Sequence, residues 1–299
     1  MKKSNIHGIL LLDKPTGITS NKVLQRIKNI YHAKKAGHAG TLDPLATGLL
    51  PICFGNATKT IPYLINSPKT YNVTASLGEK STTGDSEGKI TRATDSTINI
   101  TNDNLKLVIE SFLGDSQQIP PMHSAIKVNG RPLYKLAHKG KSIDRKPRNI
   151  TIYQIYLNSF SGNLINLTIS CSKGTYIRTL IEDISLKLGT YGYVKELRRI
   201  SIDVFNNSKM VSFEELLESD NNNLTDYLEP VDFGLMHLPS ILIDDNDMIQ
   251  FSNGQSFKYK RKCEGKPLAI RIYDADSNFL GLANQENNLI KPIKVFVNN

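Results

Sequence analysis

A carboxylate framed by glycines carries the clearest chemical signal in this sequence. Asp43 lies in the stretch AGHAGTLDPLATGLLPICFGNATK, residues 36–59, which also contains four glycines. Glycine gives the backbone conformations closed to other residues, and Pro44 disfavours helical geometry at the residue before it. Such a loop is expected to present the Asp43 side chain, so the reactive group would be a carboxylate.

Other readings of the same stretch compete with this one. Asp43 could cap a helix over residues 45–50, with Pro44 at its first position. A phosphate-binding loop over residues 55–60 lacks the second glycine before its lysine. His38 and Asp43 are too poorly spaced for a metal pair on one helix face, and no further ligand cluster supports one. The distant Cys53, Cys171 and Cys263 indicate neither a disulfide framework nor a zinc site.

Hydrophobic periodicity predicts the elements that position this loop. Residues 9–12 form a short apolar strand, and a helix capped by Ser20 follows it. Residues 71–77 and 164–171 alternate between apolar and polar positions, as half-buried strands do. Further helices are predicted around residues 105–112, from about Thr175 to Gly189, and after the capping-box pair Ser212 and Glu215.

Two domains are predicted, one over residues 1–239 and one over residues 240–299. The polar run at residues 219–225 indicates a linker, and Leu238-Pro239 a second joint. Beyond it, the strand-like pieces 268–272 and 279–283 flank a turn-rich segment, which indicates a small β-rich module.

Charge is concentrated in one stretch of the larger domain. The chain has 37 Lys and Arg against 28 Asp and Glu, a net charge of +9. A polyanionic partner fits this excess, and a solvated lysine-rich loop is the alternative. Residues 127–148 contain one acid, Asp144, and these basic residues: Lys127, Arg131, Lys135, Lys139, Lys141, Arg145, Lys146 and Arg148.

No membrane association or export is predicted. No segment approaches ~20 consecutive apolar residues. The apolar run near the N-terminus is interrupted by His7 and Gly8 and lacks a small-residue cleavage site. The expected location is the cytoplasm.

The segment at residues 37–59 closely resembles the catalytic loop of the TruB family of tRNA pseudouridine synthases. Further segments resemble that family in the same order: LLLDKPTGITS at 10–20, KTYNV at 69–73, IPPMHSAIKVNGRPLYKLA at 119–137, SKGTYIRTLIEDI at 172–184 and ELRRI at 196–200. Together they cover roughly the first 200 residues, well beyond the reach of a chance motif. The resemblance implies an α+β pseudouridine-synthase fold, with a central mixed sheet flanked by helices and loops and a C-terminal PUA-like RNA-binding module.

The resemblance also implies a reaction. Family members isomerise one uridine in the T-loop of tRNA, conventionally position 55, by breaking the C1′–N1 bond, turning the uracil and rejoining it through C5. The reaction is redox neutral, so no cofactor and no metal are expected. Extrusion of the nucleotide from its stack costs a few kcal/mol.

Residue roles follow from the same resemblance. Asp43 matches the essential aspartate, which attacks the sugar or the base or first helps to remove a sugar proton. Arg178 matches its partner, and a bidentate guanidinium would lower the pKa of the carboxyl. Tyr71 matches the tyrosine that stacks on the uracil and helps to move the C5 proton. Without the resemblance, Arg178 would be a surface residue and Tyr71 a core tyrosine.

Four residues take supporting roles in the family. His38 matches a residue that inserts near the vacated stack, Tyr176 and Leu197 match pocket residues, and Lys14 matches a lysine that supports the loop. The family uses the segment corresponding to residues 127–148 to clasp the tRNA T-arm. His123 and His138 depart from the Tyr and Arg common in relatives, which puts one RNA contact in question.

Three functions remain open on this basis. The first is a guide-independent enzyme that acts on free tRNA as a monomer without an obligate protein partner, which fits a start a few residues before LLLDKP. The second is a guide-dependent relative that modifies ribosomal RNA. The third is an RNA-binding or folding helper in which catalysis is incidental.

Overall fold

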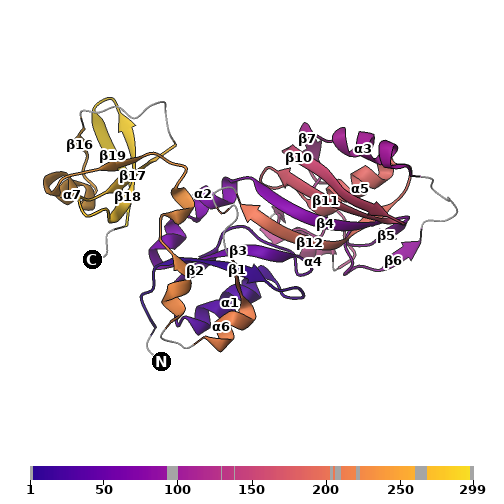
Figure 1. Ribbon diagram of the computed structural model, residues 1–299, viewed down its shortest axis with the longest axis horizontal. Helices are drawn as coiled ribbons and strands as arrows, with labels where there is room; N and C mark the ends of the chain where they lie inside the picture. Colours follow the sequence, from indigo (N-terminus) through magenta and orange to yellow (C-terminus); the bar gives the residue numbers. More distant parts are fainter. Residues whose placement is uncertain are drawn as a thin grey trace.

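The computed structural model describes residues 3–92, 100–128, 130–137, 139–202, 205, 210–219, 223–259 and 268–296. His138 and Cys263 lie outside these ranges. The molecule is elongated, with a large mixed sheet and its helices on the right of Figure 1 and a small β-rich module on the left. The predicted α+β class is confirmed, as is the central sheet flanked by helices and loops.

The large sheet brings together strands from most of the first 230 residues. Its order is β13-β1-β3-β12-β4-β11-β10-β7, with β2 beside β3 and β14 beside β1. The β1–β13 and β3–β12 pairs are parallel and the other pairs antiparallel. The strands are β1 (Gly8–Lys14), β2 (Ala36–His38), β3 (Thr47–Phe54), β4 (Lys69–Leu77), β7 (Gly114–Gln118), β10 (Arg148–Ser161), β11 (Leu164–Cys171), β12 (Gly192–Ile202), β13 (Val211–Ser212) and β14 (Leu228–Glu229).

Helices cover both halves of this sheet and bury its apolar side chains. Helix α5 packs on β12 and on α3, while α1 contacts β2 and α6 contacts β1. Each fully buried aliphatic side chain stabilises the fold by about 1.5–3 kcal/mol. The helical segments are α1 (Ser20–Ile30), α2 (Ile61–Asn66), α3 (Asn102–Glu110), α5 (Ile177–Lys187), α6 (Phe213–Glu218), and the 3₁₀ turns η1 (Gly55–Lys59), η3 (Leu224–Tyr227) and η4 (Phe233–Leu235).

One local prediction is wrong and one alternative is excluded, and both concern residues near Asp43. Helix α1 is capped by Thr19, whose side chain accepts from the Lys22 N–H. Ser20 is instead buried in the first turn. No helix covers residues 45–50, because β3 begins at Thr47 and its apolar residues are buried between β1 and β12. The helix-cap alternative for Asp43 is thereby excluded.

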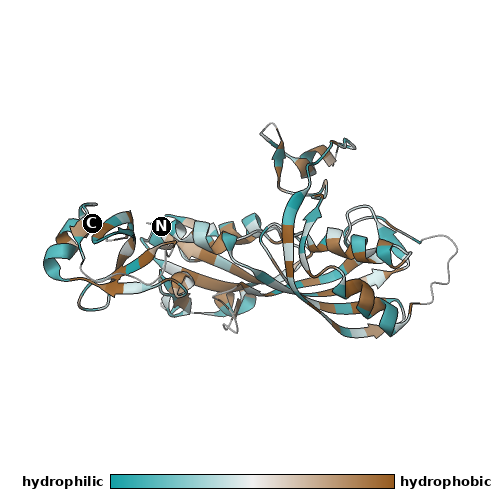
Figure 2. Cartoon of the chain, turned by 90° about the horizontal axis from the view of Figure 1, so that it is seen from above, coloured by the Kyte–Doolittle hydropathy of each residue, from teal (hydrophilic) through white to brown (hydrophobic). Residues whose placement is uncertain are grey.

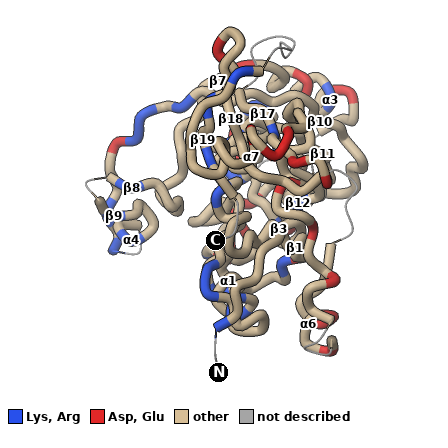
Figure 3. The backbone as a smooth tube through the Cα atoms, turned by 90° about the vertical axis from the view of Figure 1, so that its left-hand side faces the viewer, with Lys and Arg blue, Asp and Glu red and all other residues tan. Residues whose placement is uncertain are grey.

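The basic segment 127–148, called here the basic arm, stands apart from the body. Figure 3 shows its elements β8 (Lys127–Val128), β9 (Arg131–Pro132) and α4 (Leu133–Ala137) separated from the sheet. Another hairpin, β5 (Glu79–Ser81) with β6 (Ile90–Arg92), follows β4. The β5–β6 hairpin and His123, which precedes the basic arm, lie close to the loop that contains Asp43, as the contacts of Arg178 show below.

The C-terminal module has its own sheet and core. Its strands β15 (Ser240–Leu242), β16 (Phe257–Lys258), β17 (Ile270–Tyr273), β18 (Phe279–Glu286) and β19 (Leu289–Val295) run in the order β15-β17-β18-β19-β16, beside α7 (Asp245–Ser252). Figure 2 shows it at the end of the molecule that also holds the N-terminus. Asn56 and Lys59 of η1 donate side-chain hydrogen bonds to the Phe296 and Val295 carbonyls, at 2.9 and 2.8 Å.

Candidate active site

A cavity of about 480 Å³ opens beside the glycine-framed loop. Five residues assigned from the sequence line it together: Asp43, Tyr71, Tyr176, Arg178 and Leu197. They come from the loop before β3, from β4, from the start of α5 and from β12, so only the folded chain brings them together. The volume lies within the range of small-molecule sites, and one extruded nucleoside fits such a space.

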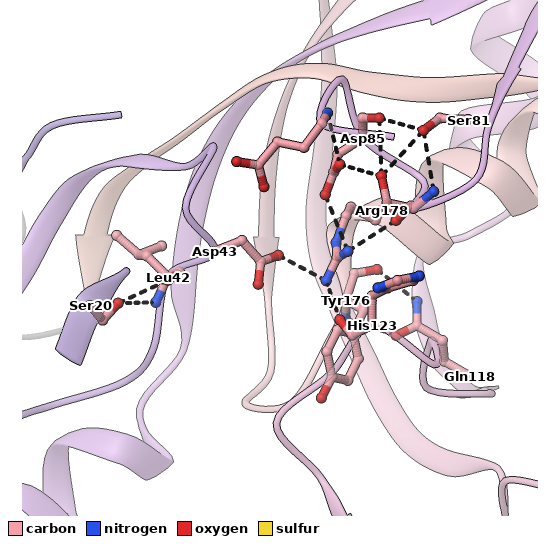
Figure 4. A network of polar contacts seen from close by, with 11 residues as sticks. Ser20, Leu42, Asp43, Ser81, Asp85, Gln118, His123, Tyr176 and Arg178 are labelled. Carbon is pink, nitrogen blue, oxygen red and sulfur yellow. Dashed lines mark hydrogen bonds and ion pairs between the residues drawn. The ribbon is translucent and has the colours of Figure 1, made fainter. Parts of the chain in front are cut away.

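Asp43 and Arg178 form an ion pair at the wall of this cavity. Arg178 Nη2 lies 3.0 Å from Asp43 Oδ2 (Figure 4). The Arg178 side chain is only 5% exposed, whereas that of Asp43 is 37% exposed. The arginine is therefore held inside the protein, and the carboxylate that it steadies faces the open space.

The guanidinium of Arg178 is shared between two carboxylates, so the predicted bidentate contact is wrong. Its Nη1 donates to Asp85 Oδ2 at 3.2 Å and to the Thr83 carbonyl at 3.0 Å. Its Nη2 also donates to the His123 carbonyl at 2.8 Å. Two carboxylates and two backbone carbonyls thus fix the plane of the guanidinium, and only its Nη2 contacts Asp43.

Asp85 is a part of the site that the sequence reasoning missed. Its side chain is 3% exposed and lies on the loop between β5 and β6. It also accepts hydrogen bonds from the Thr83 hydroxyl and from the Glu87 N–H, at 2.5 and 3.1 Å. The signal that could have found it is the acid within TTGDSEG, a second glycine-framed carboxylate.

Burial raises the pKa of the Asp43 carboxyl above its ordinary value. Desolvation by the cavity wall is the largest cause, and the nearby Asp85 adds to it. Arg178 and, more weakly, Lys14 act in the opposite direction. The predicted lowering of this pKa by Arg178 is present, but burial outweighs it, because the same cation also serves a second carboxylate.

Two buried donors hold the loop on either side of Asp43. The Ser20 hydroxyl donates to the Leu42 carbonyl at 2.9 Å and accepts from the Leu42 N–H at 2.8 Å. Lys14 Nζ donates to the carbonyls of Pro15, Pro44 and Ala46, at 2.9, 3.2 and 2.7 Å. Lys14 is fully buried, and this burial lowers its pKa to about 8. Its place under the loop matches the supporting role that the resemblance implies.

The aromatic side chains line the cavity from two directions. Tyr71 on β4 lies in register with Ile169 on one side and Arg199 on the other, and burial raises the pKa of its phenol. Tyr176 precedes α5 and exchanges two hydrogen bonds with the Gln118 side chain, at 2.8 and 3.1 Å. Burial also raises the pKa of Tyr176. Both phenols are therefore neutral near pH 7 and offer flat faces to a ligand.

His38 does not line the cavity, and of the basic arm only its last residue, Arg148, does. His38 lies on β2 opposite Ile52 of β3, and burial with the nearby Arg199 lowers its pKa, so the ring is neutral near pH 7. Arg145 is fastened at the base of the arm, where its Nη1 donates to the Pro120 carbonyl at 3.2 Å. The other six assigned arm residues are exposed: Lys127, Arg131, Lys135, Lys139, Lys141 and Lys146.

Two basic residues at the cavity were not assigned individually as RNA contacts, although Arg148 belongs to the basic segment 127–148. Arg148, at the start of β10, and Lys173, in the turn before α5, line it and are exposed. Lys173 Nζ also donates to Asn66 Oδ1 at 2.7 Å. Lys173 belongs to the SKGTY segment, whose charge could have drawn attention to it. Both place positive charge beside a space that fits a nucleoside.

The described ranges contain neither a cluster of metal ligands nor a membrane-spanning helix. That part of the chain contains no group of three or more His, Cys, Asp or Glu side chains arranged to hold a metal ion. None of its helices has both the length and the apolar character to cross a membrane.

The fold is that of the pseudouridine synthases. A chain in the crystal structure of a Cbf5-Nop10-Gar1 complex superimposes with a TM-score of 0.73 at 23% identity, over 97% of this chain and 85% of that one. A chain in an H/ACA RNP bound to a substrate RNA containing 2′-deoxyuridine gives the same TM-score at 22% identity, over 98% and 86% of the two chains.

Sequence comparison identifies the family. Residues 28–177 match the N-terminal domain of the TruB family pseudouridylate synthases, residues 178–236 the tRNA pseudouridylate synthase B C-terminal domain, and residues 239–296 the C-terminal domain of pseudouridine synthase II TruB. The chain belongs to the TruB family. Proteins named tRNA pseudouridine synthase B are similar along nearly their whole length: that of Pseudomonas fluorescens is 42% identical over 97% of this chain and 95% of its own, and that of Buchnera aphidicola 46% identical over 97% and 96%.

Proposed function

We propose that this protein converts the uridine at position 55 in the T-loop of tRNA to pseudouridine, without a guide RNA. The observation that carries the proposal is the Asp43–Arg178 ion pair at 3.0 Å, in a cavity also lined by Tyr71 and Leu197. The relatives of 39–46% identity, all named tRNA pseudouridine synthase B, support tRNA as the substrate.

In the proposed reaction Asp43 acts as the nucleophile, and the bond that its carboxylate forms to the sugar or the base is broken again before the product leaves, which restores the free carboxylate. The C1′–N1 bond breaks, the uracil turns, and a C1′–C5 bond forms; C5 then loses its proton and N1 gains one, so the reaction is redox neutral. An ionised carboxylate can attack the sugar or the base, or take a sugar proton, and the geometry of Arg178 suits each route. Arg178 stabilises the ionised form, and Tyr71 stacks on the uracil and helps to move the C5 proton.

Access to the cavity requires base flipping, because Asp43 lies inside a protein pocket and the target base is stacked in the T-loop. Extruding it costs a few kcal/mol, which new stacking against Tyr71 and Tyr176 and apolar contact with Leu197 would offset. His38 is proposed to occupy the vacated stack. Its neutral ring suits an apolar gap between bases better than a charged one would.

The basic arm is proposed to hold the T-arm through its phosphates. Replacing Lys139, Lys141 and Lys146 with alanine should weaken tRNA binding and reduce the slope of log K against log salt by about 0.9 per lost phosphate contact. A matched triple replacement of Lys89, Lys106 and Lys195, also exposed, should leave that slope unchanged. Binding titrations at several salt concentrations measure both. Equal slopes for both variants would mean that the arm is a solvated loop and does not contact the tRNA phosphates.

Arg145 is left out of that set because it contacts the Pro120 carbonyl. Arg145→Ala is expected to loosen the base of the arm and to weaken binding with a smaller change in salt slope than the three lysines give together.

We further propose that the chain divides near residue 239, with residues 240–299 forming a PUA-like RNA-binding module. The division is supported by the second sheet, whose first strand starts at Ser240. The enzyme is proposed to act in the cytoplasm as a monomer with no obligate protein partner. The alternative of an enzyme that modifies ribosomal RNA is disfavoured because the relatives of 39–46% identity are named tRNA pseudouridine synthase B.

The decisive experiment is to map pseudouridine in an unmodified tRNA transcript after incubation with the purified protein. The expected product is a single pseudouridine at position 55, without added RNA, metal or cofactor. No product, or product only when a guide RNA or partner is supplied, would overturn the proposal. Tight tRNA binding without any product would favour the folding-helper function.

A further inference from the structure

Positive charge dominates the wall of the cavity that contains Asp43. Among the described residues that line it, Asp43 is the one acid, and five are cations: Lys69, Arg148, Lys173, Arg178 and Arg199. A nucleoside itself is uncharged, so the base and the sugar do not account for this excess. Charges removed from water need partners, which are either groups of the protein or groups of the bound RNA.

Three of the five cations are buried and have acceptors within the protein. Arg178 pairs with two carboxylates. Lys69, on β4, donates to two carbonyls at the C-terminal end of α2, at 2.6 and 2.5 Å. Arg199, on β12, donates to the Leu49 carbonyl at 2.7 Å. These three side chains therefore hold the framework of the cavity.

Lys173 and Arg148 differ from these three. Both are exposed, so they lie where the cavity opens to solvent, and neither forms an ion pair with a carboxylate of the described ranges. Lys173 Nζ donates to a neutral acceptor, Asn66 Oδ1, at 2.7 Å. A phosphate oxygen accepts more strongly from an ammonium than an amide oxygen does, because it is charged. The Asn66 contact is therefore one that a phosphate can replace.

The backbone beside Lys173 leaves room for such a ligand. Gly174 has a φ of +81°, which favours glycine, and a Cβ there would meet no atom within 4 Å. Helix α5 then begins at Ile177, which also lines the cavity, and its first turn contains no acidic residue. Because the start of a helix has partial positive charge, this end of α5 does not oppose an anion at the opening.

We propose that Lys173 binds the phosphodiester next to the extruded uridine, exchanging its Asn66 partner for a phosphate oxygen, and that Arg148 adds charge beside the same opening. The inference rests on the proposed function and adds a phosphate subsite to it. A nucleotide that enters the cavity base first keeps its phosphates at the opening, where these two side chains lie. Their contacts offset part of the free energy that extrusion of the base costs.

The test is a thermodynamic cycle between one side chain and one phosphate, measured as binding affinity. T-arm hairpins carry a single uncharged methylphosphonate, placed in turn at each linkage of the loop. Next to uridine 55, this replacement should weaken binding to the parent protein by about 10-fold, but binding to Lys173→Gln by less than about twofold. Equal penalties in both proteins at every linkage, or coupling only at a linkage remote from uridine 55, would overturn the proposal.

Arg148→Gln is tested in the same cycle. It should reduce the methylphosphonate penalty at one of the two linkages that flank uridine 55, because its charge lies beside the same opening. A full penalty at both linkages would remove Arg148 from the subsite.

Two further variants separate phosphate binding from a structural contact. Asn66→Ala removes the partner of Lys173 but keeps the ammonium, so RNA affinity should stay unchanged or rise by up to about threefold. Weakening as large as that of Lys173→Gln would make the pair a structural contact and refute the exchange. Lys187→Gln is the matched control, because Lys187 is exposed at the other end of α5 and likewise donates to a neutral oxygen, Ser111 Oγ, at 2.7 Å. It should keep the full methylphosphonate penalty, and an equal reduction there would assign the effect to net charge.

The binding cycle also distinguishes failure of this inference from failure of the proposed function, because it does not depend on product formation. If the parent protein makes no pseudouridine at position 55, the proposed function fails, while the cycle still shows whether Lys173 contacts a phosphate beside that uridine. If pseudouridine forms but no flanking linkage couples to Lys173, the function stands and the phosphate subsite is wrong.

Discussion

Asp43→Asn is expected to abolish pseudouridine formation, with a loss of at least about 10⁴-fold, while tRNA binding stays within about twofold of the parent protein. The amide has nearly the shape of the carboxylate and can still contact Arg178. It lacks the negative charge that a nucleophile or base requires at this position. Asp43 lies in the cavity and not on the basic arm, so phosphate contacts are unaffected.

The measurement is product formation in single-turnover assays, with tRNA affinity determined in parallel. Asp115→Asn is the control, because Asp115 is an exposed aspartate on the edge strand β7 and should be replaceable without loss of activity. Substantial activity in Asp43→Asn would remove Asp43 from the chemistry. Loss of binding together with activity would indicate that the variant disturbs the RNA surface.

The raised pKa of Asp43 predicts how activity depends on pH. The reaction needs the ionised carboxylate, so activity should fall as pH drops through a midpoint above the ordinary aspartate value of 3.8. The effect on stability has the opposite sign. Because the folded state binds this proton more tightly than the unfolded chain, protonation of Asp43 favours folding as pH falls. Loss of activity at acid pH in a protein that stays folded would separate the effect of Asp43 protonation on catalysis from its effect on stability.

The sequence predicted the parts of this site that are local, and the structure supplied those that depend on distant contacts. The Asp43 loop, β4 with Tyr71, and α5 with Arg178 follow from glycine placement, alternation and helical spacing. The sequence predicts the helix cap at Ser20, whereas its neighbour Thr19 is the cap. Both residue types are favoured at this position, so the local sequence does not distinguish them. Its actual bonds to Leu42 join residues 22 positions apart, which no local pattern encodes.

Arg178 is a second example of a residue whose contacts the sequence did not predict, because it pairs with both Asp43 and Asp85. The family resemblance paired Arg178 with Asp43 alone. It compares sequence segments, and these do not show which other residues lie near Arg178 in the folded chain. The second acid, Asp85, lies 93 positions earlier in the chain, and the loop carrying it has no strong periodicity. The net pKa of Asp43 depends on that second acid and on burial, so its direction required the folded structure.

Arg178→Met is expected to lower both activity and stability, for two separable reasons. Asp43 loses the cation that holds it ionised and oriented, so pseudouridine formation should fall by about 10³-fold or more. Asp85, 3% exposed, is left as a buried charge without a counter-ion, which costs about 3–5 kcal/mol of unfolding free energy. Arg198→Met is the matched control. Its pair with Asp13 is 40% and 28% exposed, so its loss should cost no more than about 1 kcal/mol.

The double variant Arg178→Met with Asp85→Asn separates the two reasons. Neutralising Asp85 removes the uncompensated charge, so most of the stability lost in Arg178→Met should return, as measured by denaturant unfolding. Activity should not return, because Asp43 still has no partner. Recovery of both would mean that Arg178 serves catalysis only by keeping the site folded. If neither stability nor activity recovers, the stability loss comes from the Thr83 and His123 carbonyls, which lose the Arg178 donor in both variants. The predicted split follows from geometry: one guanidinium nitrogen serves the cavity, and the other serves the interior of the protein.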